Sequence, residues 1–424
     1  MEFLIIISII ILVITLLISK DKLCNPIVLF NGMWIVSLVL YKINYLGFIN
    51  VSDKTILILG IMILFFPLGV ICGIKNRIKI VYKKQIANNK QYIFNEKLLS
   101  ILCYITIVFL FYTEIHIIMQ LYEGDTFNDI IHSFSGKGTV IIKGPIMNSI
   151  NIFIVAPVSY IISPIAASLL FNNHKNKWKF FILNIIIVAL NVAHHGGRNH
   201  IFLMIISYLF TYFMTSKKEK LSIKHKLLIV VICIVVTILI LLISKSRGFD
   251  DLFSSYYAYL TCSIPLTEIY INELKDYVTT LGGYFSFNGF FYPLMSIIDF
   301  FEFGLPNRYI LTQSVRFFIE DNYVYIGEYN HLLNAFLPIG TYFYFDGGIL
   351  FEIIGMFLYG FITGCFYKKV FEEGMRLRKY SIYVFILIGL ILSFTRCWFS
   401  SYNYALAFLY FYIIFTRRSK KVYE

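Results

Sequence analysis

Apolar runs of about 20 residues recur along the whole chain, and each is long enough to cross a bilayer as one helix. The runs are continuously apolar rather than alternating, as expected of helices and not of half-buried strands. Charged residues make up only 14% of the 424 residues, whereas soluble domains carry about 25%. The sequence therefore predicts an all-α, polytopic integral membrane protein.

We expect about 11 transmembrane helices and one large external loop that contains short helices. The expected spans cover residues 3–19, 26–47, 55–73, 98–121, 145–171, 180–194, 198–215, 226–244, 347–367, 380–397 and 401–416. The first run lacks a basic n-region and a cleavage site, so we expect it to be retained as a span.

These spans divide the chain into three segments. Residues 1–244 hold about eight helices, residues 245–346 form the large loop, and residues 347–424 hold about three helices and a basic tail. Inside the loop, the pattern at 254–277 predicts a helix. The apolar segment at 289–303 is too short for an ordinary span and predicts an interfacial or re-entrant helix.

The connections between spans alternate in their content of lysine and arginine. One side of the membrane carries 26 of these residues and the other side 10, with Lys42 inside a span. By the positive-inside rule the richer side is cytoplasmic, which places the N-terminus outside, the C-terminus inside and the large loop outside. The net charge of +13 is therefore a topological signal, and we expect no nucleic-acid partner.

Arginine is distributed differently from lysine. Half of the 10 arginines but only five of the 27 lysines fall on the external side. The external arginines are Arg198, Arg247, Arg308, Arg316 and Arg396. A guanidinium fork binds phosphate or pyrophosphate bidentately while it stays charged, so we expect these residues to bind a phosphorylated substrate. Snorkelling to lipid headgroups is the alternative for any single one.

A histidine-rich segment, His194 to His200, joins two spans with hardly any loop. Gly196 and Gly197 permit a tight turn and a close approach of ligand to backbone. We expect His195 and Asn199 to contact phosphate, with a plain cluster of polar residues at the membrane edge as the alternative. No Asp or Glu accompanies the histidines, so we expect no metal site.

A second polar cluster surrounds His331, where the large loop meets the next span. An imidazole with an ordinary pKa near ~6.5 accepts a proton at neutral pH, so His331 suits a general base. Tyr329, Asn334 and Asp346 lie near it in the sequence and are expected to contact the substrate. A polar anchor at the membrane edge is the alternative role.

Three short segments carry a family resemblance. They are Ser244-Lys245-Ser246-Arg247-Gly248, Tyr329-Asn330-His331-Leu332-Leu333-Asn334, and the Asp-Gly-Gly-x-x-x-Glu-x-x-Gly pattern from Asp346 to Gly355. With the topology, these segments resemble the Wzy-type O-antigen and capsule repeat-unit polymerases. The related O-antigen ligases share the first two segments.

The resemblance implies a membrane architecture like that of the C class of glycosyltransferases, in a bacterial inner membrane. Such enzymes transfer a glycan from undecaprenyl pyrophosphate onto another lipid-linked repeat unit, without metal or cofactor. Arg247 and Arg198 would hold the pyrophosphate and His331 would act on the acceptor. The implied partners are the lipid-linked oligosaccharide, membrane lipids, a chain-length regulator and a flippase.

Other functions remain open at this point. A ligase that uses a lipid A core acceptor has the same chemistry, and acceptor choice lies in the unmatched part of the loop. A flippase or other transporter usually has duplicated halves, and no halves correspond here. A structural scaffold leaves the external arginines unexplained. The sequence favours the polymerase.

Overall fold

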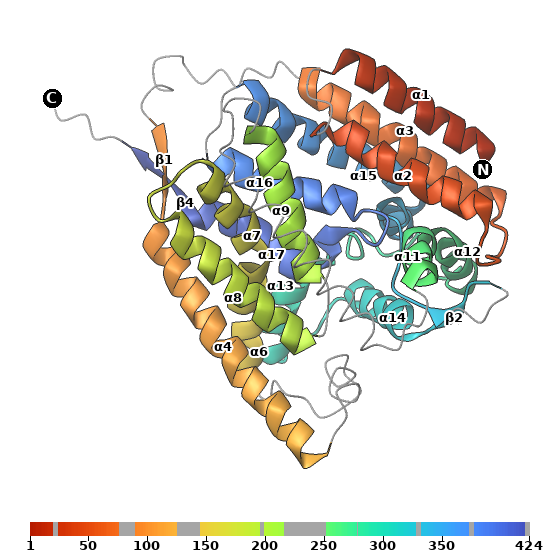
Figure 1. The fold of residues 1–424 in the computed structure, drawn as a ribbon. Helices are drawn as coiled ribbons and strands as arrows, with labels where there is room; N and C mark the ends of the chain where they lie inside the picture. Colours follow the sequence, from red (N-terminus) through yellow and green to blue (C-terminus); the bar gives the residue numbers. More distant parts are fainter. Residues whose placement is uncertain are drawn as a thin grey trace. The chain divides into compact units, whose positions relative to one another are not determined.

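The structure is a computed structural model that describes residues 1–19, 24–75, 90–124, 145–195, 199–215, 252–277, 279–327, 332–372 and 377–419. The described chain is helical almost throughout (Figure 1). It forms two compact units. Unit 1 comprises Met1–Asn76, Phe249–Gly374 and Ile386–Tyr402, and unit 2 comprises Arg77–Gly248, Met375–Phe385 and Asn403–Glu424. The units reflect packing, whereas the three segments expected from the sequence reflect topology, so that division stays a prediction.

Unit 1 contains the first three helices and most elements of the large loop. Its elements are α1 (Glu2–Ile18), α2 (Pro26–Ile43), α3 (Asp53–Lys75), α11 (Leu252–Thr261), α12 (Ser263–Glu273), α13 (Asn288–Phe300), α14 (Asn307–Asp321), β2 (Val324–Tyr325), β3 (Leu332–Leu333), α15 (Ile339–Glu372) and the 3₁₀ turn η4 (Trp398–Ser400).

Unit 2 is built around four longer helices. Its elements are β1 (Lys90–Phe94), α4 (Glu96–Glu123), α6 (Pro145–Ile150), the π-helical turn η3 (Asn151–Val155), α7 (Ala156–Phe171), α8 (Lys177–His195), α9 (Asn199–Thr215) and β4 (Phe415–Ser419). Two further helices, α16 (Leu377–Ile391) and α17 (Tyr402–Ile414), carry residues of both units.

Several helices are long and apolar enough to cross a membrane. Among the described residues there are five: Pro26–Ile43, Asp53–Lys75, Glu96–Glu123, Ile146–Phe171 and Ile339–Phe371. The shorter apolar helices α1, α9 and α17 accompany them. These helices confirm the predicted helical membrane protein. The count of about 11 spans stays a prediction, and the expected span at 226–244 lies outside the described residues.

The helices α3 and α15 pack backbone against backbone through four glycines. Gly69 and Gly73 in α3, and Gly360 and Gly364 in α15, each face a backbone carbonyl of the other helix. A Cβ atom on any of them would lie 2.1 to 2.3 Å from that oxygen. Each pair has the small-xxx-small spacing that lets membrane helices approach closely, since lipid provides no hydrophobic drive for their association.

Alanine at either contact is therefore expected to weaken the fold. Gly69→Ala and Gly360→Ala should each lower the free energy of unfolding by about 1–3 kcal/mol, because backbone cannot move aside as a side chain can. Thermal unfolding of the purified protein in detergent measures the loss. Gly32→Ala in α2 is the matched control, since nothing lies within 4 Å of a Cβ there. Equal melting temperatures for all three variants would contradict close packing.

A kink at Gly347 and Gly348 divides α15. The φ angle of +70° at Gly348 is one that glycine adopts without cost. The sequence pattern started a span at residue 347, and the structure adds the buried helical segment 339–346 before the kink. A Cβ on Gly340 would lie 2.8 Å from Oε1 of Glu352, so this segment lies against the first turns after the kink.

The connection between α2 and α3 packs on the helices of the large loop. The backbone N–H of Tyr45 donates to the Tyr257 hydroxyl (3.0 Å), which itself donates to the carbonyl of Leu40. The Glu268 carboxylate accepts hydrogen bonds from the hydroxyls of Ser52 and Thr55, both at 2.7 Å. Two segments that the charge pattern assigns to the external side are therefore held together within unit 1.

In unit 2, a short sheet joins segments far apart in the chain. Strand β1 pairs antiparallel with β4, so that Lys90 lies opposite Ser419 and Phe94 opposite Phe415. The Phe94 ring also contacts His174, between α7 and α8, at 5.8 Å between centroids. Three connections that the charge pattern assigns to the cytoplasmic side therefore lie at one end of unit 2.

Candidate functional site

The three residues expected to be catalytic, His331, Arg247 and Arg198, lie outside the described residues, as does Tyr329. His195 is the last residue of α8, and its side chain also lies outside the described part. The remaining expected residues lie in two places: Asn199 is in unit 2, and the others are all in unit 1.

Arg316, on α14, is held at both ends of its guanidinium group. Its Nη2 atom lies 3.1 Å from Oε1 of Glu320, one helical turn further along. Its Nη1 atom donates to the backbone carbonyl of Ser400 at 2.9 Å. The i, i+4 spacing brings the first pair together, whereas the second contact links α14 to the turn η4.

Arg396 lies within electrostatic reach of the same carboxylate. Burial alone would raise the pKa of Glu320, but the charges of Arg316 and Arg396 and the hydrogen bond from Arg316 lower it below its ordinary value. Glu320 therefore stays ionised beside two arginines. No motif in the sequence singles out Glu320, although its i, i+4 spacing from Arg316 is a usable signal.

Asn334 and Asp346 hold the backbone around these charges. The Asn334 side chain donates to the backbone carbonyl of Glu320. The two carboxylate oxygens of the buried Asp346 accept from the backbone N–H groups of Phe285 and Ser286, both at 2.9 Å. In this arrangement Asp346 fixes the turn that precedes α13, rather than presenting free oxygens.

Arg308 is exposed in the first turn of helix α14. Its side chain lies over the turn that precedes α13, which Asp346 holds. A Cβ on Gly282 would lie 3.1 Å from its Nη1 atom, and the Gly282 N–H donates to the backbone carbonyl of Asp346 at 2.8 Å. Arg308 and Arg316 are separated by eight residues of helix, or about 12 Å along the axis. Arg308, Arg316, Arg396, Asn334 and Asp346 thus surround one region of unit 1, although they come from four separate stretches of sequence.

Asn199 belongs to unit 2. It begins α9, and its Nδ2 atom donates to the Tyr160 hydroxyl of α7 at 2.9 Å. Next to it, the buried His200 ring meets the Tyr160 ring edge to face at 5.2 Å. The contact fixes how α9 begins directly after Arg198, one of the arginines expected to bind pyrophosphate.

Tyrosines of the loop mostly pack on other rings. Tyr292 stacks on Tyr402 with centroids 5.2 Å apart, and Tyr284 meets Phe291 at 4.6 Å. These pairs stabilise α13 against its neighbours in unit 1. Tyr323 and Tyr325, by contrast, are exposed beside β2, where an aromatic face is available to a sugar ring.

The arginine group can bind an anion that carries several oxygens. Two guanidinium groups lie within electrostatic reach of the Glu320 carboxylate, and a third, that of Arg308, is exposed on the same helix as Arg316. A phosphate or pyrophosphate presents acceptors that match the guanidinium fork. No set of three or more His, Cys, Asp or Glu that suits a metal ion occurs among the residues that the structure describes.

The Glu320 charge should make stability depend on pH. A lowered pKa in the folded state means that the pair stabilises the fold fully above the unfolded-state pKa of about 4.3. This stabilisation is lost as pH falls from there through the lower folded-state pKa. Because Glu320 is 44% exposed, we expect the Glu320→Gln loss at neutral pH to stay below about 1 kcal/mol. Unfolding midpoints at pH 7 and at a pH about two units below the unfolded-state pKa measure it, with Glu302→Gln as control. A loss that is equal at both pH values would mean that charge is not its source.

A comparison with family models matches residues 1–323 to the model described as O-antigen polysaccharide polymerase Wzy. Comparisons with the curated proteins and with the solved structures give no match. The matched range contains Arg198, Arg247, Arg308 and Arg316, whereas His331, Asp346 and Arg396 follow it. Because the match covers well over half of the 424 residues, the chain belongs to the O-antigen polysaccharide polymerase Wzy family, whose members are membrane proteins of polysaccharide biosynthesis.

Proposed function

We propose that the protein transfers a growing glycan from undecaprenyl pyrophosphate onto the non-reducing sugar of another lipid-linked repeat unit, at the outer face of the membrane. Membership of the Wzy family, with its polymerase activity on lipid-linked oligosaccharide, carries this proposal. The excess of arginine on the side assigned as external supports the choice of a pyrophosphate donor.

In the proposed reaction, an acceptor hydroxyl attacks the anomeric carbon of the donor sugar. The bond from that carbon to the pyrophosphate oxygen breaks, and the pyrophosphate leaves with the electron pair. His331 takes the hydroxyl proton, which contributes ~10²–10⁴-fold to the rate. Arg247 and Arg198 stabilise the charge that develops on the leaving group, at ~10²–10³-fold for each such donor.

The arginines that the structure describes are suited to binding the substrate rather than to the chemical step. Arg316 and Arg396 are held beside Glu320 in unit 1, and exposed Arg308 lies over the turn that Asp346 fixes. A negatively charged lipid-linked glycan that approaches this region gains guanidinium contacts without a change of backbone. We assign Arg308, Arg316 and Arg396 to substrate binding, together with Asn334, Tyr329, His195 and Asn199. Asp346 serves by holding the backbone that carries them.

A deletion strain and a purified enzyme test the proposal together. Without the protein, cells should carry single repeat units in place of the ladder of longer chains. The purified protein should lengthen lipid-linked repeat units with no lipid A core present, which separates polymerase from ligase. Because the proposed chemistry uses no metal, excess EDTA should leave this turnover intact. A strain that lacks surface glycan altogether would favour a flippase.

The side of the membrane is testable by labelling. Lys275→Cys, in the large loop, should react with a membrane-impermeant maleimide added outside intact spheroplasts. Lys175→Cys, between α7 and α8, should react only after lysis. Both lysines are exposed in the structure, so access within the fold does not limit either reaction. Cys72 is an exposed native thiol and must be replaced first. Reversed labelling would place the arginines on the cytoplasmic side and would overturn the proposed mechanism.

A further inference from the structure

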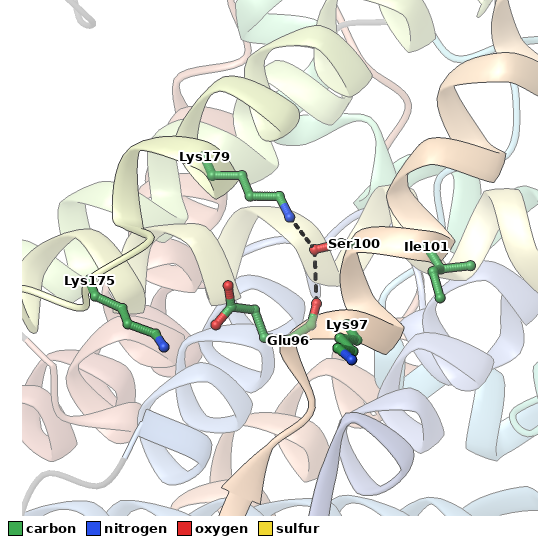
Figure 2. A pocket seen from close by; sticks show the side chains of 6 residues that line it. All are labelled: Glu96, Lys97, Ser100, Ile101, Lys175 and Lys179. Atoms are coloured by element: carbon green, nitrogen blue, oxygen red, sulfur yellow. Dashed lines mark hydrogen bonds between the residues drawn. The ribbon is translucent and has the colours of Figure 1, made fainter.

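An open pocket of about 450 Å³ lies in unit 2, where α4 and α8 begin. It is lined by Glu96, Lys97, Ser100, Ile101, Lys175 and Lys179 (Figure 2). The proposed polymerase reaction uses none of these residues, and the charge pattern assigns this end of unit 2 to the side opposite the reaction.

The pocket has more positive than negative charge. Three lysines and one carboxylate line it, and that carboxylate, of Glu96, accepts a hydrogen bond from the Asn176 side chain. The Lys179 Nζ atom donates to the Ser100 hydroxyl at 2.8 Å, and that hydroxyl donates to the Glu96 backbone carbonyl at 2.8 Å (Figure 2). No ion pair of these lysines occurs within the described residues. The lining of the pocket therefore favours an anion over a cation.

The pocket lies at the border between polar and apolar surface. It includes the first residues of α4, the candidate membrane span Glu96–Glu123. Ile101, which lines the pocket, is 55% exposed, and the neighbouring large side chains of α4 and α8 are also more than half exposed: Tyr104 (51%), Trp178 (52%) and Ile182 (54%). Tryptophan and tyrosine beside lysine are typical of the headgroup level of a bilayer. A ligand here has its charged part among lysines and its apolar part on exposed hydrocarbon.

We propose that this pocket binds the phosphate of an anionic membrane lipid, with the acyl chains lying along the exposed side of α4 and α8. Lysine ammonium groups bind phosphate as point charges, and three of them line this pocket. A basic residue near an anionic leaflet strengthens binding by roughly fivefold, so the three lysines together give a clear preference over a zwitterionic lipid. The Ser100 hydroxyl holds Lys179 in place for this contact.

The neighbouring Lys177 offers a control that distinguishes lipid binding in the pocket from general electrostatic attraction to the membrane. Lys177 lies in the first turn of α8, but its Nζ atom donates to Oδ1 of Asn173 at 2.8 Å and it does not line the pocket. General attraction of a basic surface would depend on Lys177 as much as on its neighbours. A pocket would depend on Lys97, Lys175 and Lys179 alone.

Lipid binding to the purified full chain tests the proposal. Native mass spectrometry should show phosphatidylglycerol bound to the wild-type protein at least tenfold more tightly than phosphatidylcholine. Each of Lys97→Gln, Lys175→Gln and Lys179→Gln should weaken phosphatidylglycerol binding by roughly fivefold. Lys177→Gln should bind as the wild type does. Lys97, Lys175 and Lys179 are exposed, so each single variant is expected to fold.

Three results would overturn the proposal. Equal affinities for phosphatidylglycerol and phosphatidylcholine would show that the net charge of the headgroup does not contribute to binding. An equal loss in Lys177→Gln would show general surface attraction. Displacement of phosphatidylglycerol by millimolar inorganic phosphate would identify a site for free phosphate rather than for a lipid. Polymerase activity can fail or persist in these variants without bearing on any of the three results.

Discussion

His331→Ala is expected to lower the rate of glycan transfer by ~10²–10⁴-fold, because the acceptor hydroxyl would lose its base. Insertion and folding should be preserved, since the sequence places His331 at a membrane edge rather than in an apolar run. Cells with this variant should accumulate single repeat units on the lipid carrier. Purified protein with lipid-linked repeat units gives the rate directly.

The matched control for His331 is His116→Ala. His116 lies on α4 against the Tyr112 ring, with centroids 4.6 Å apart, and has no role in the proposed reaction. It should give the wild-type ladder. In the wild type, transfer should fall as pH drops below the ordinary histidine pKa of about 6.5, because the protonated ring cannot accept a proton.

Full-length polymer from well-expressed His331→Ala would assign the base elsewhere. Two carboxylates would then need testing, Asp299 and Asp346. The oxygens of Asp346 are occupied by the N–H groups of Phe285 and Ser286, whereas Asp299 is exposed near the end of α13. Asp299 would therefore come first.

Apolar runs predicted the helices well, because a membrane span needs a continuous apolar stretch. The expected span at 55–73 lies within α3, and the one at 98–121 lies within α4. Most of the short apolar segment at 289–303 forms α13, in which Leu294 and Phe300 remain exposed, as a helix at a membrane surface requires. Its position relative to the membrane stays a prediction.

Elements that depend on distant contacts were not predicted. The sequence pattern assigns the segment 339–346 to the loop, because the Gly347-Gly348 pair interrupts the helical pattern between this segment and the rest of α15. The amphipathic helix α14 contains Arg308, Gln313, Arg316 and Glu320, so no apolar run marks it. The pairing of β1 with β4 joins residues more than 300 positions apart, and no local pattern specifies such a pair.

The candidate site was predictable in its residue types and not in its contacts. The excess of external arginine selected Arg308, Arg316 and Arg396 from the sequence. Helical spacing pairs Arg316 with Glu320, but the bond from Arg316 to the Ser400 carbonyl spans 84 positions. Asp346 accepts two backbone hydrogen bonds that the sequence does not reveal, and its contact with the substrate stays a prediction. A carboxylate in a Gly-rich turn can contact a substrate or accept hydrogen bonds from the backbone, and its sequence alone does not show which of the two it does.

Positive charge alone does not explain why the external side is enriched in arginine relative to lysine. Lysine and arginine have the same effect on membrane topology, so a preference for arginine on one side must come from geometry. The planar fork presents two parallel donors to the oxygens of one phosphate, whereas an ammonium group presents a single point of charge. This difference predicts that a change that conserves charge will still be costly.

Arg247→Lys and Arg198→Lys are therefore each expected to lower transfer by ~10²–10³-fold, although the positive charge stays. Chain-length profiles should shift towards single repeat units in both variants at normal protein levels. The control is Arg378→Lys, where the guanidinium packs over the Tyr412 ring at 4.7 Å on the side assigned as cytoplasmic. Its polymer should match that of the wild type. Normal ladders from both external variants would mean that these arginines anchor the protein to headgroups, since for that role a lysine serves equally well.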